Sequence, residues 1–272
     1  MKNLKLFFIK INFIVIIVSC CDAFGEQDNN LKLKENVTII SLGESCFPAT
    51  MLRNFKIRDV AYPFDWMITP FMGLYKTLSN NFANFLNEAN LIKDPFNSKF
   101  VVDKESGVKF AHDFPHHYQH GSEIYYVNQN FDDTYWGIGS IIPNFKEALP
   151  DIKNKYNRRI ERFFSISKLP NHIIFIRSVA SEWYHNEVKN VDLYKNNLSL
   201  KQQSIMLRKK KKKMFPMLNF SLIFTANVDE VKKPWNINLI KNFYVPTENG
   251  DPNSEYCLRW KQILFELALV QY

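Results

Sequence analysis

The chain has 272 residues, of which 46% are hydrophobic and 15% aromatic, with only 8 glycines. This composition excludes collagen-like, glycine-rich and disordered classes, and it supplies enough apolar surface for one substantial core. The formal net charge of +8 comes from two short segments, because residues 1–25 carry a net two positive charges and residues 208–213 carry six. The remainder is neutral, so its charge gives no reason to expect nucleic-acid binding.

Residues 1–25 have the layout of a secretory signal peptide. Lys2 and Lys5 precede a mostly apolar stretch over residues 6–18, and small residues follow it. We therefore expect cleavage near residue 25 and an exported protein, either secreted or periplasmic.

Two alternatives to simple cleavage remain open. Cys20 stands in a lipoprotein-like sequence and would then be lipidated, whereas an uncleaved leader would act as a membrane anchor. The apolar run is shorter than the roughly 20 residues that span a bilayer, which disfavours the anchor. In each case we expect residues 26–36 to be a polar linker and residues 37–272 to form a single α/β domain.

The segment from Val37 to Leu52, VTIISLGESCFPATML, predicts a strand, a tight turn at Gly43 and the start of a helix at Cys46. The positive end of a helix dipole favours a thiolate, and the unpaired N–H groups there are donors for an oxyanion. Cys46 is therefore a candidate nucleophile. The alternative is a small buried cysteine that packs against the strand.

Only Cys46 and Cys257 remain if the leader is removed. In an oxidising compartment these two cysteines could form a disulfide, and Cys46 would then have a structural role. The sequence contains no CxxC and no Cys/His cluster, which disfavours a zinc site.

Asp65 stands alone among aromatic residues in the segment IRDVAYPFDWMITP, residues 57–70. A carboxylate next to Phe64 and Trp66 is costly to bury unless another group pairs with it. We expect such a partner. The alternative to a catalytic role is a carboxylate that accepts backbone N–H bonds within a turn.

The period of the apolar residues changes towards two between residues 99 and 130. The sequence FVVDKESGVKFAHDF predicts a β-hairpin with its turn at Asp103 to Gly107, and IYYVNQNF predicts a further strand. His112 falls at the end of the hairpin. From there an imidazole can reach a thiol on another element, so His112 is a candidate general base.

Three more histidines follow, and we expect them in a loop. His116, His117 and His120 lie between Pro115 and Gly121. A metal site with ligands four residues apart requires a helix, which Pro115 discourages, so we expect no metal here.

Five short segments together resemble one family of unknown function, described as papain-like cysteine peptidases. They are SLGESCFPATMLR (41–53), AYPFDW (61–66), FAHDF (110–114), NRRIERF (157–163) and HIIFIRS (172–178). The order of cysteine before histidine is also that of papain-like enzymes. The resemblance implies that Cys46 is the nucleophile and His112 the base.

The second half of the chain predicts alternating helices and strands. We expect a helix over residues 143–169 and another over 255–270. Buried strands are expected in HIIFIRS, in SLIFTAN (221–227) and in INLIKNFYV (237–245). The alternation predicts an α/β fold with a mixed or mostly parallel central sheet flanked by helices, and with the hairpin at 99–130 as an insertion.

Two groups of basic residues remain to be interpreted. Arg158 and Arg159 lie on the helix at 143–169, where a solvated face is favoured over an anion site. The run Lys209 to Lys213 resembles a nucleic-acid tract, but no aromatic stacking platform accompanies it. We expect a solvated face there, with contact to a membrane surface as its one partner interaction.

The catalytic hypothesis places Cys46 as the nucleophile and His112 as the base, with backbone N–H groups at the helix start as oxyanion donors. Asp65 is our candidate for the third group, and Asn128 on the next predicted strand is the reserve. Asp113 is disfavoured, because neighbours on a strand point to opposite faces. No cofactor is implied. The substrate would be a peptide or another acyl compound.

Two other classes stay open. Gly43-Glu44-Ser45 after a strand is similar to the first block of SGNH-type serine esterases, with Ser45 as the nucleophile, but the last histidine is His185 and no late Asp-x-x-His follows. The other class is a non-catalytic exported surface or binding module in which Cys46 only packs.

Overall fold

The structure is a computed structural model that describes most of the chain from residue 32 onward. The described residues are 32–33, 36–58, 60–95, 100–120, 123–127, 138–179, 198–246, 255–267 and 270–271. The expected leader therefore lies outside the described residues.

A parallel four-stranded sheet lies at the centre. It consists of β2 (Val37–Ser41), β10 (His172–Val179), β11 (Phe220–Ala226) and β12 (Ile240–Tyr244), in the order β12-β11-β10-β2. Every strand predicted from an apolar run is present, and the expectation of an α/β fold with a mostly parallel central sheet is confirmed.

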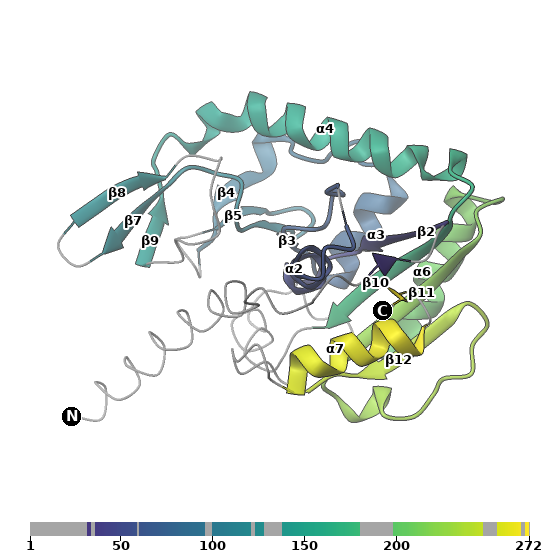
Figure 1. Ribbon diagram of the computed structural model, residues 1–272. Coiled ribbons are helices and arrows are strands. Elements are labelled where there is room, and N and C mark those ends of the chain that lie inside the picture. The colour runs from purple at the N-terminus through teal and green to yellow at the C-terminus, as the bar shows by residue number, and fades with distance from the viewer. Residues whose placement is uncertain are drawn as a thin grey trace.

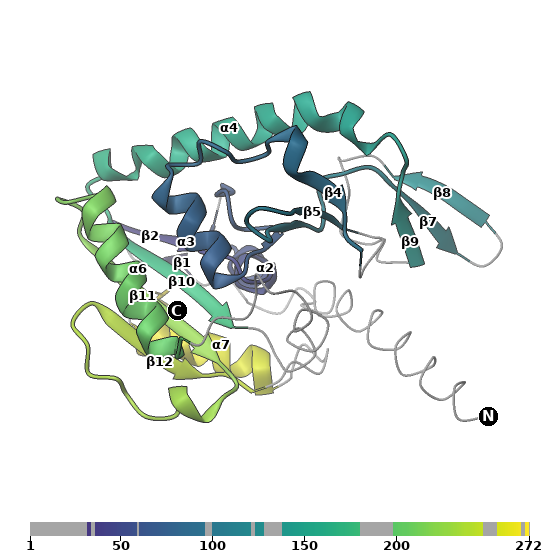
Figure 2. The same ribbon diagram turned by 180° about the vertical axis from the view of Figure 1, so that it is seen from behind.

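Helices cover both faces of this sheet. Helix α7 (Glu255–Glu266) lies in front of it in Figure 1, and α6 (Leu200–Met214) lies in front of it in the reverse view of Figure 2. Successive side chains of β10 alternate between the two cores: Phe175 packs in the core with α6, and Ile174 in the core with α7. Because each face is covered, the two central strands β10 and β11 are buried at nearly every position.

A second, antiparallel sheet lies beside the parallel one. Its strand order is β3 (Met67–Ile68), β6 (Lys109–Phe110), β5 (Val101–Asp103) and β4 (Leu91–Lys93). The Asp103 carboxylate accepts the N–H of Glu105 at 2.9 Å and of Ser106 at 3.0 Å, which closes the turn between β5 and β6. The predicted hairpin with its turn at residues 103–107 is confirmed.

The remaining helices among the described residues pack around these sheets. They are α2 (Phe47–Asn54), α3 (Phe71–Ser79) and α4 (Leu149–Ser165), with the short 3-10 helices η1 (Glu88–Asn90), η2 (Phe145–Ala148), η3 (Ile166–Lys168) and η5 (Asp229–Val231). Figures 1 and 2 show α4 running along one side of the molecule, above α3 and the antiparallel sheet. Aromatic contacts join α4 to both sheets, since Phe163 contacts Phe175 of β10 and Tyr156 contacts Phe110 of β6.

A third sheet corrects one expectation. Strands β7 (His116–His120), β8 (Glu123–Val127) and β9 (Ile138–Ile141) form an antiparallel sheet in the order β8-β7-β9. The strand expected at IYYVNQNF is confirmed as β8. However, His116, His117 and His120 belong to strand β7, so their assignment to a loop was wrong. The region from 99 to 130 thus contributes to two separate sheets.

The ends of the described chain meet. Strand β1 (Lys32–Leu33), within the expected linker, pairs antiparallel with β13 (Val270–Gln271). The last helix ends at Glu266, so the expectation of a helix through Val270 was too long. Within the residues that the structure describes, no helix is long and apolar enough to span a membrane.

Lys211 corrects the interpretation of the cationic run. Its side chain is fully buried, with Nζ 4.1 Å from the ring centroids of both Phe163 and Phe175 and 5.9 Å from that of Phe215. Nζ has no hydrogen-bond partner among the described residues. Burial, with a smaller contribution from Lys210, lowers the pKa of Lys211 well below 10.5. The run is therefore not a uniformly solvated face.

We predict that Lys211→Met stabilises the protein by about 1–3 kcal/mol at neutral pH, since a buried amine without a hydrogen bond is replaced by an apolar chain of similar length. Between the lowered pKa of Lys211 in the folded protein and 10.5, the unfolded chain binds more protons than the folded protein. The wild-type free energy of unfolding should therefore rise, relative to the variant, as the pH increases towards 10.5. Urea denaturation at several pH values measures this, and the exposed Lys209→Met is the control. Equal effects at both positions would contradict the prediction.

Candidate active site

The turn between β2 and α2 requires two residues in the left-handed region. Gly43 has φ +72° and Glu44 has φ +78°. A Cβ atom on Gly43 would lie 2.2 Å from the Thr69 hydroxyl oxygen, so only glycine fits there. Glu44 is not a glycine, and its conformation is one that L residues adopt only where surrounding contacts impose it. The backbone just before Cys46 is thus held in a strained form.

Cys46 is the N-cap residue of α2 and is partly exposed. Its side chain makes no capping hydrogen bond to the helix. The expected placement of Cys46, after a strand and turn and at a helix start, is confirmed. Pro48 in the first turn has no N–H, so the backbone donors there are those of its neighbours Ala49 and Phe47, of which Phe47 donates to the Ser45 hydroxyl oxygen at 3.4 Å.

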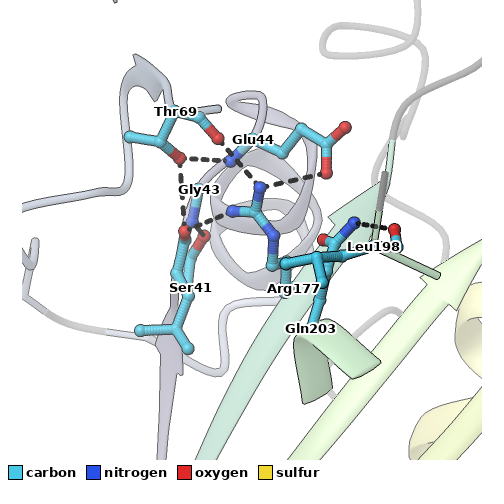
Figure 3. A network of polar contacts seen from close by, with 8 residues as sticks. Ser41, Gly43, Glu44, Thr69, Arg177, Leu198 and Gln203 are labelled. Atoms are coloured by element: carbon cyan, nitrogen blue, oxygen red, sulfur yellow. Dashed lines mark hydrogen bonds and ion pairs between the residues drawn. The ribbon is translucent and has the colours of Figure 1, made fainter. Parts of the chain in front are cut away.

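A buried arginine holds this turn in place, as Figure 3 shows. Arg177, near the end of β10, is 1% exposed. Its Nη1 donates to the carbonyl oxygen of Leu42 at 3.1 Å, its Nη2 donates to the carbonyl oxygen of Thr69 at 2.9 Å, and Nη2 lies 3.4 Å from the Glu44 carboxylate. One guanidinium therefore joins the parallel sheet, the turn before Cys46 and the segment that follows β3.

Thr69 connects the turn to the antiparallel sheet. The N–H of Glu44 donates to the Thr69 hydroxyl oxygen at 2.6 Å, and this hydroxyl donates to the carbonyl oxygen of Leu42 at 3.3 Å. Strand β3 precedes Thr69 directly and pairs with β6 through Met67 and Phe110. His112 follows β6 by two residues, so the segments that carry Cys46 and His112 are joined through β3.

His112 lies in a bend and is half-buried. Its ring meets that of Trp66 edge to face, with 5.9 Å between centroids. The guanidinium of Arg53, on α2, lies 5.1 Å from the centroid of the same Trp66 ring. Trp66 therefore contacts both His112 and a side chain of the helix that begins at Cys46. The direct pairing of the Cys46 thiol with the His112 ring stays a prediction.

Asp65 is fully buried and has the partner that its surroundings required. Its carboxylate forms an ion pair with Arg58 and accepts the N–H of Tyr62 at 2.6 Å. Burial raises the pKa of the Asp65 carboxyl to about 6, and Arg58 opposes this rise. These contacts match the turn carboxylate that we gave as the alternative. Orientation of His112 by Asp65 stays a prediction.

The two other candidates for the third catalytic group were Asp113 and Asn128. Asp113 accepts a hydrogen bond from the Tyr156 hydroxyl at 2.7 Å and pairs with Lys155 at 2.6 Å, so its carboxylate is bound to α4. Asn128, the reserve candidate, lies outside the described residues.

Cys257 is buried in the core between α7 and the sheet, and no disulfide joins it to Cys46. The alternative of a Cys46–Cys257 disulfide was therefore wrong. Among the described residues, no group of three His, Cys, Asp or Glu side chains is placed to hold a metal ion. The described side chains do not include those of His116, His117 and His120.

The sequence interpretation missed three residues that shape the site: Glu44, Thr69 and Arg177. The signal for Arg177 was a single charge at the end of the apolar run HIIFIRS, which in a sheet covered on both faces must find buried partners. Glu44 and Thr69 gave no such signal, because their roles depend on contacts across 25 residues of sequence or more.

The fold and the site define an α/β protein with a cysteine at a helix start after the first parallel strand. A family described as "Putative papain-like cysteine peptidase" matches residues 37–210. The chain belongs to this family. It is also 23% identical over 163 residues to the uncharacterized protein R408 of Acanthamoeba polyphaga mimivirus, covering 53% of this chain and 63% of that protein. No solved structure matches the chain.

We predict that Arg177→Met lowers the free energy of unfolding by about 3–5 kcal/mol, because it removes an ion pair with the buried Glu44 carboxylate and two hydrogen bonds to buried backbone carbonyl oxygens. Arg177→Lys should recover only part of this loss, since an ammonium group lacks the planar fork of donors. Denaturant unfolding measures both. Arg208, whose Nη1 donates to the carbonyl oxygen of Asn238, is the control, and Arg208→Met should cost less than about 1 kcal/mol. Similar losses at positions 177 and 208 would contradict the assigned role.

Proposed function

We propose that this protein is a thiol acyl hydrolase of the cysteine-peptidase type, with Cys46 as its nucleophile and His112 as its general base. The observation that carries the proposal is the position of Cys46, which is partly exposed at the N-cap of α2 and directly beyond the carboxyl end of a parallel strand. Catalytic and binding residues gather at that edge of parallel α/β sheets. A cysteine that served only packing would need no exposure.

The chemistry would proceed in two steps. His112 takes the thiol proton, and the Cys46 sulfur attacks the acyl carbon of a peptide or another acyl substrate. The intermediate collapses, and the leaving group departs with the proton returned by His112. Water, deprotonated by His112, then attacks the thioester, releases the carboxylic acid and restores the thiol. Backbone N–H groups at the start of α2 would stabilise the oxyanion in both steps.

Asp65 remains our candidate for orienting His112. The ladder between β3 and β6 pairs Met67, two residues after Asp65, with Phe110, two residues before His112, so the segments that carry the two side chains are neighbours. A carboxyl with a pKa near 6 would be ionised at neutral pH and able to accept an imidazole N–H.

One observation disfavours the serine esterase. Ser45 is 5% exposed, and its hydroxyl oxygen accepts the N–H of Phe47 at 3.4 Å. A hydroxyl buried within the turn is poorly placed to meet a substrate, whereas the neighbouring residue Cys46 is partly exposed.

We predict that Cys46 reacts with iodoacetamide with an apparent pKa below the usual 8.5, because the helix dipole and a protonated His112 both stabilise the thiolate. Mass spectrometry of the alkylated Cys46 peptide across a pH series measures this. His112→Ala should raise the apparent pKa. Cys257→Ala is the matched control and should leave the reaction unchanged, since Cys257 is buried. If the apparent pKa of Cys46 is the same in the wild type and in His112→Ala, the proposed pair is refuted and a non-catalytic module is favoured.

We further propose that the protein is exported and that its leader is removed. Mass spectrometry of the exported protein should find a new N-terminus between Ala23 and Gln27, because small residues near position 25 suit cleavage. A lipidated Cys20 or an intact Met1 would show that simple cleavage does not occur.

A further inference from the structure

Two arginine side chains lie over the Trp66 ring, and a third lies within electrostatic reach of one of them. The guanidinium carbons of Arg53 and Arg58 lie 5.1 Å and 5.5 Å from the ring centroid. Arg159 of α4 is close enough to Arg58 to interact with it electrostatically. We call Arg53, Arg58 and Arg159 the arginine cluster.

The cluster holds like charges close together. Burial lowers the pKa of Arg58, and the neighbouring charges of Arg53 and Arg159 lower it further, whereas Asp65 opposes this. The Asp65 carboxylate forms an ion pair with Arg58 and also interacts with Arg159. Repulsion among guanidinium groups favours the binding of a further anion, which would reduce it.

Arg159 has donor capacity left over. Its guanidinium lies over the Tyr156 ring at 5.0 Å, and its buried Nη1 has no hydrogen-bond partner among the described residues. A buried charged donor without an acceptor is costly. Planar guanidinium groups bind the oxygens of a carboxylate or a phosphate in pairs, and both are anions of matching geometry.

The cluster adjoins the candidate active site. The Trp66 ring that Arg53 and Arg58 cover is also the ring that His112 contacts. Arg53 belongs to the helix that begins at Cys46 and is exposed, so the cluster is open to solvent on that side.

We infer that the arginine cluster is a substrate subsite that binds an oxyanion, and that the enzyme selects acyl substrates carrying an acidic group near the bond that is broken. The role of the cluster as a substrate subsite rests on the proposed function, whereas the binding of an anion there does not. The oxyanion is a carboxylate of an acidic peptide or a phosphate group, and the experiment separates these two sources.

The test uses the full chain and three probes: N-acetylglutamate α-amide, its uncharged counterpart N-acetylglutamine α-amide, and inorganic phosphate. Calorimetric titration at low salt should show that the glutamate compound binds at least about tenfold more tightly than the glutamine compound. The preference should fall as the salt concentration rises. Competition by phosphate would indicate that any oxyanion is accepted, and its absence would assign the site to carboxylates.

Variants test which residues carry this preference. Arg159→Gln and Arg53→Gln should each reduce it about tenfold, whereas Arg158→Gln, an exposed arginine on the same helix, should leave it unchanged. Arg159→Lys keeps the positive charge and should retain part of the preference for the glutamate compound. Arg53 is exposed, so its variant should fold even if Arg159→Gln does not. Equal binding of the two amides, or a preference that survives both Gln variants in a folded protein, would overturn the inference.

The two proposals fail in different ways. Binding of the glutamate compound should also slow the alkylation of Cys46 by iodoacetamide, which links the subsite to the thiol. Selective binding to a protein whose Cys46 is unreactive would leave the anion site in place and reject the hydrolase. A reactive Cys46 without selective binding would reject the subsite alone.

Discussion

The arrangement of the site depends on the burial of the Arg177 guanidinium at the end of β10. A buried cation is costly unless acceptors surround it, and here two backbone carbonyl oxygens and one carboxylate do so. These acceptors come from the turn before Cys46 and from the segment after β3. The two hydrogen bonds and the ion pair of Arg177 therefore form only when both segments are docked on the parallel sheet. The same contacts hold the strained turn.

Lys211 is another buried basic residue, and its Nζ has no hydrogen-bond acceptor among the described residues. It lies on α6, in the same core as Arg177, but it is surrounded by the rings of Phe163, Phe175 and Phe215. The lysine responds by a lowered pKa, which an arginine cannot do to the same extent. Burial of charge alone is thus no sign of a site. The network of Arg177 is informative because its partners lie next to Cys46.

Much of the fold could be predicted because its signals are local. Apolar runs such as HIIFIRS indicate strands covered on both faces, and DKESG indicates a hairpin turn. The histidines at 116–120 were misplaced because Pro115 and Gly121 outweighed a strand pattern of only five residues. Lys211 was misread because a run of identical cations hides which position faces the core. On an α-helix only one face of such a run meets the core.

The local placements of Cys46 and His112 were predictable from the sequence, whereas the contacts that connect their segments were missed, for a physical reason. Cys46 is recognisable from its own strand, turn and helix, and His112 from its hairpin. Whether Asp65 has a partner is also predictable, but not that the partner is Arg58. The contacts that connect these elements run through Thr69, Arg177 and Trp66, and each is long-range. Sequence periodicity contains no information about such pairs.

The extent of the family match agrees with this division of roles. Residues 37–210 contain β2, α2, β3, β6 and β10 with the turns beside them, and every residue of the candidate site lies within this range. The match ends within α6, whereas β11, β12 and α7 lie beyond it. Those elements complete the parallel sheet and cover one of its faces, and they contribute core residues such as Phe224 and Trp260.

A core of this kind tolerates changes that keep its volume and apolar character, whereas the Arg177 network requires particular donors and acceptors at fixed positions. The part of the chain that holds Cys46 in place is therefore the part in which resemblance is expected to persist.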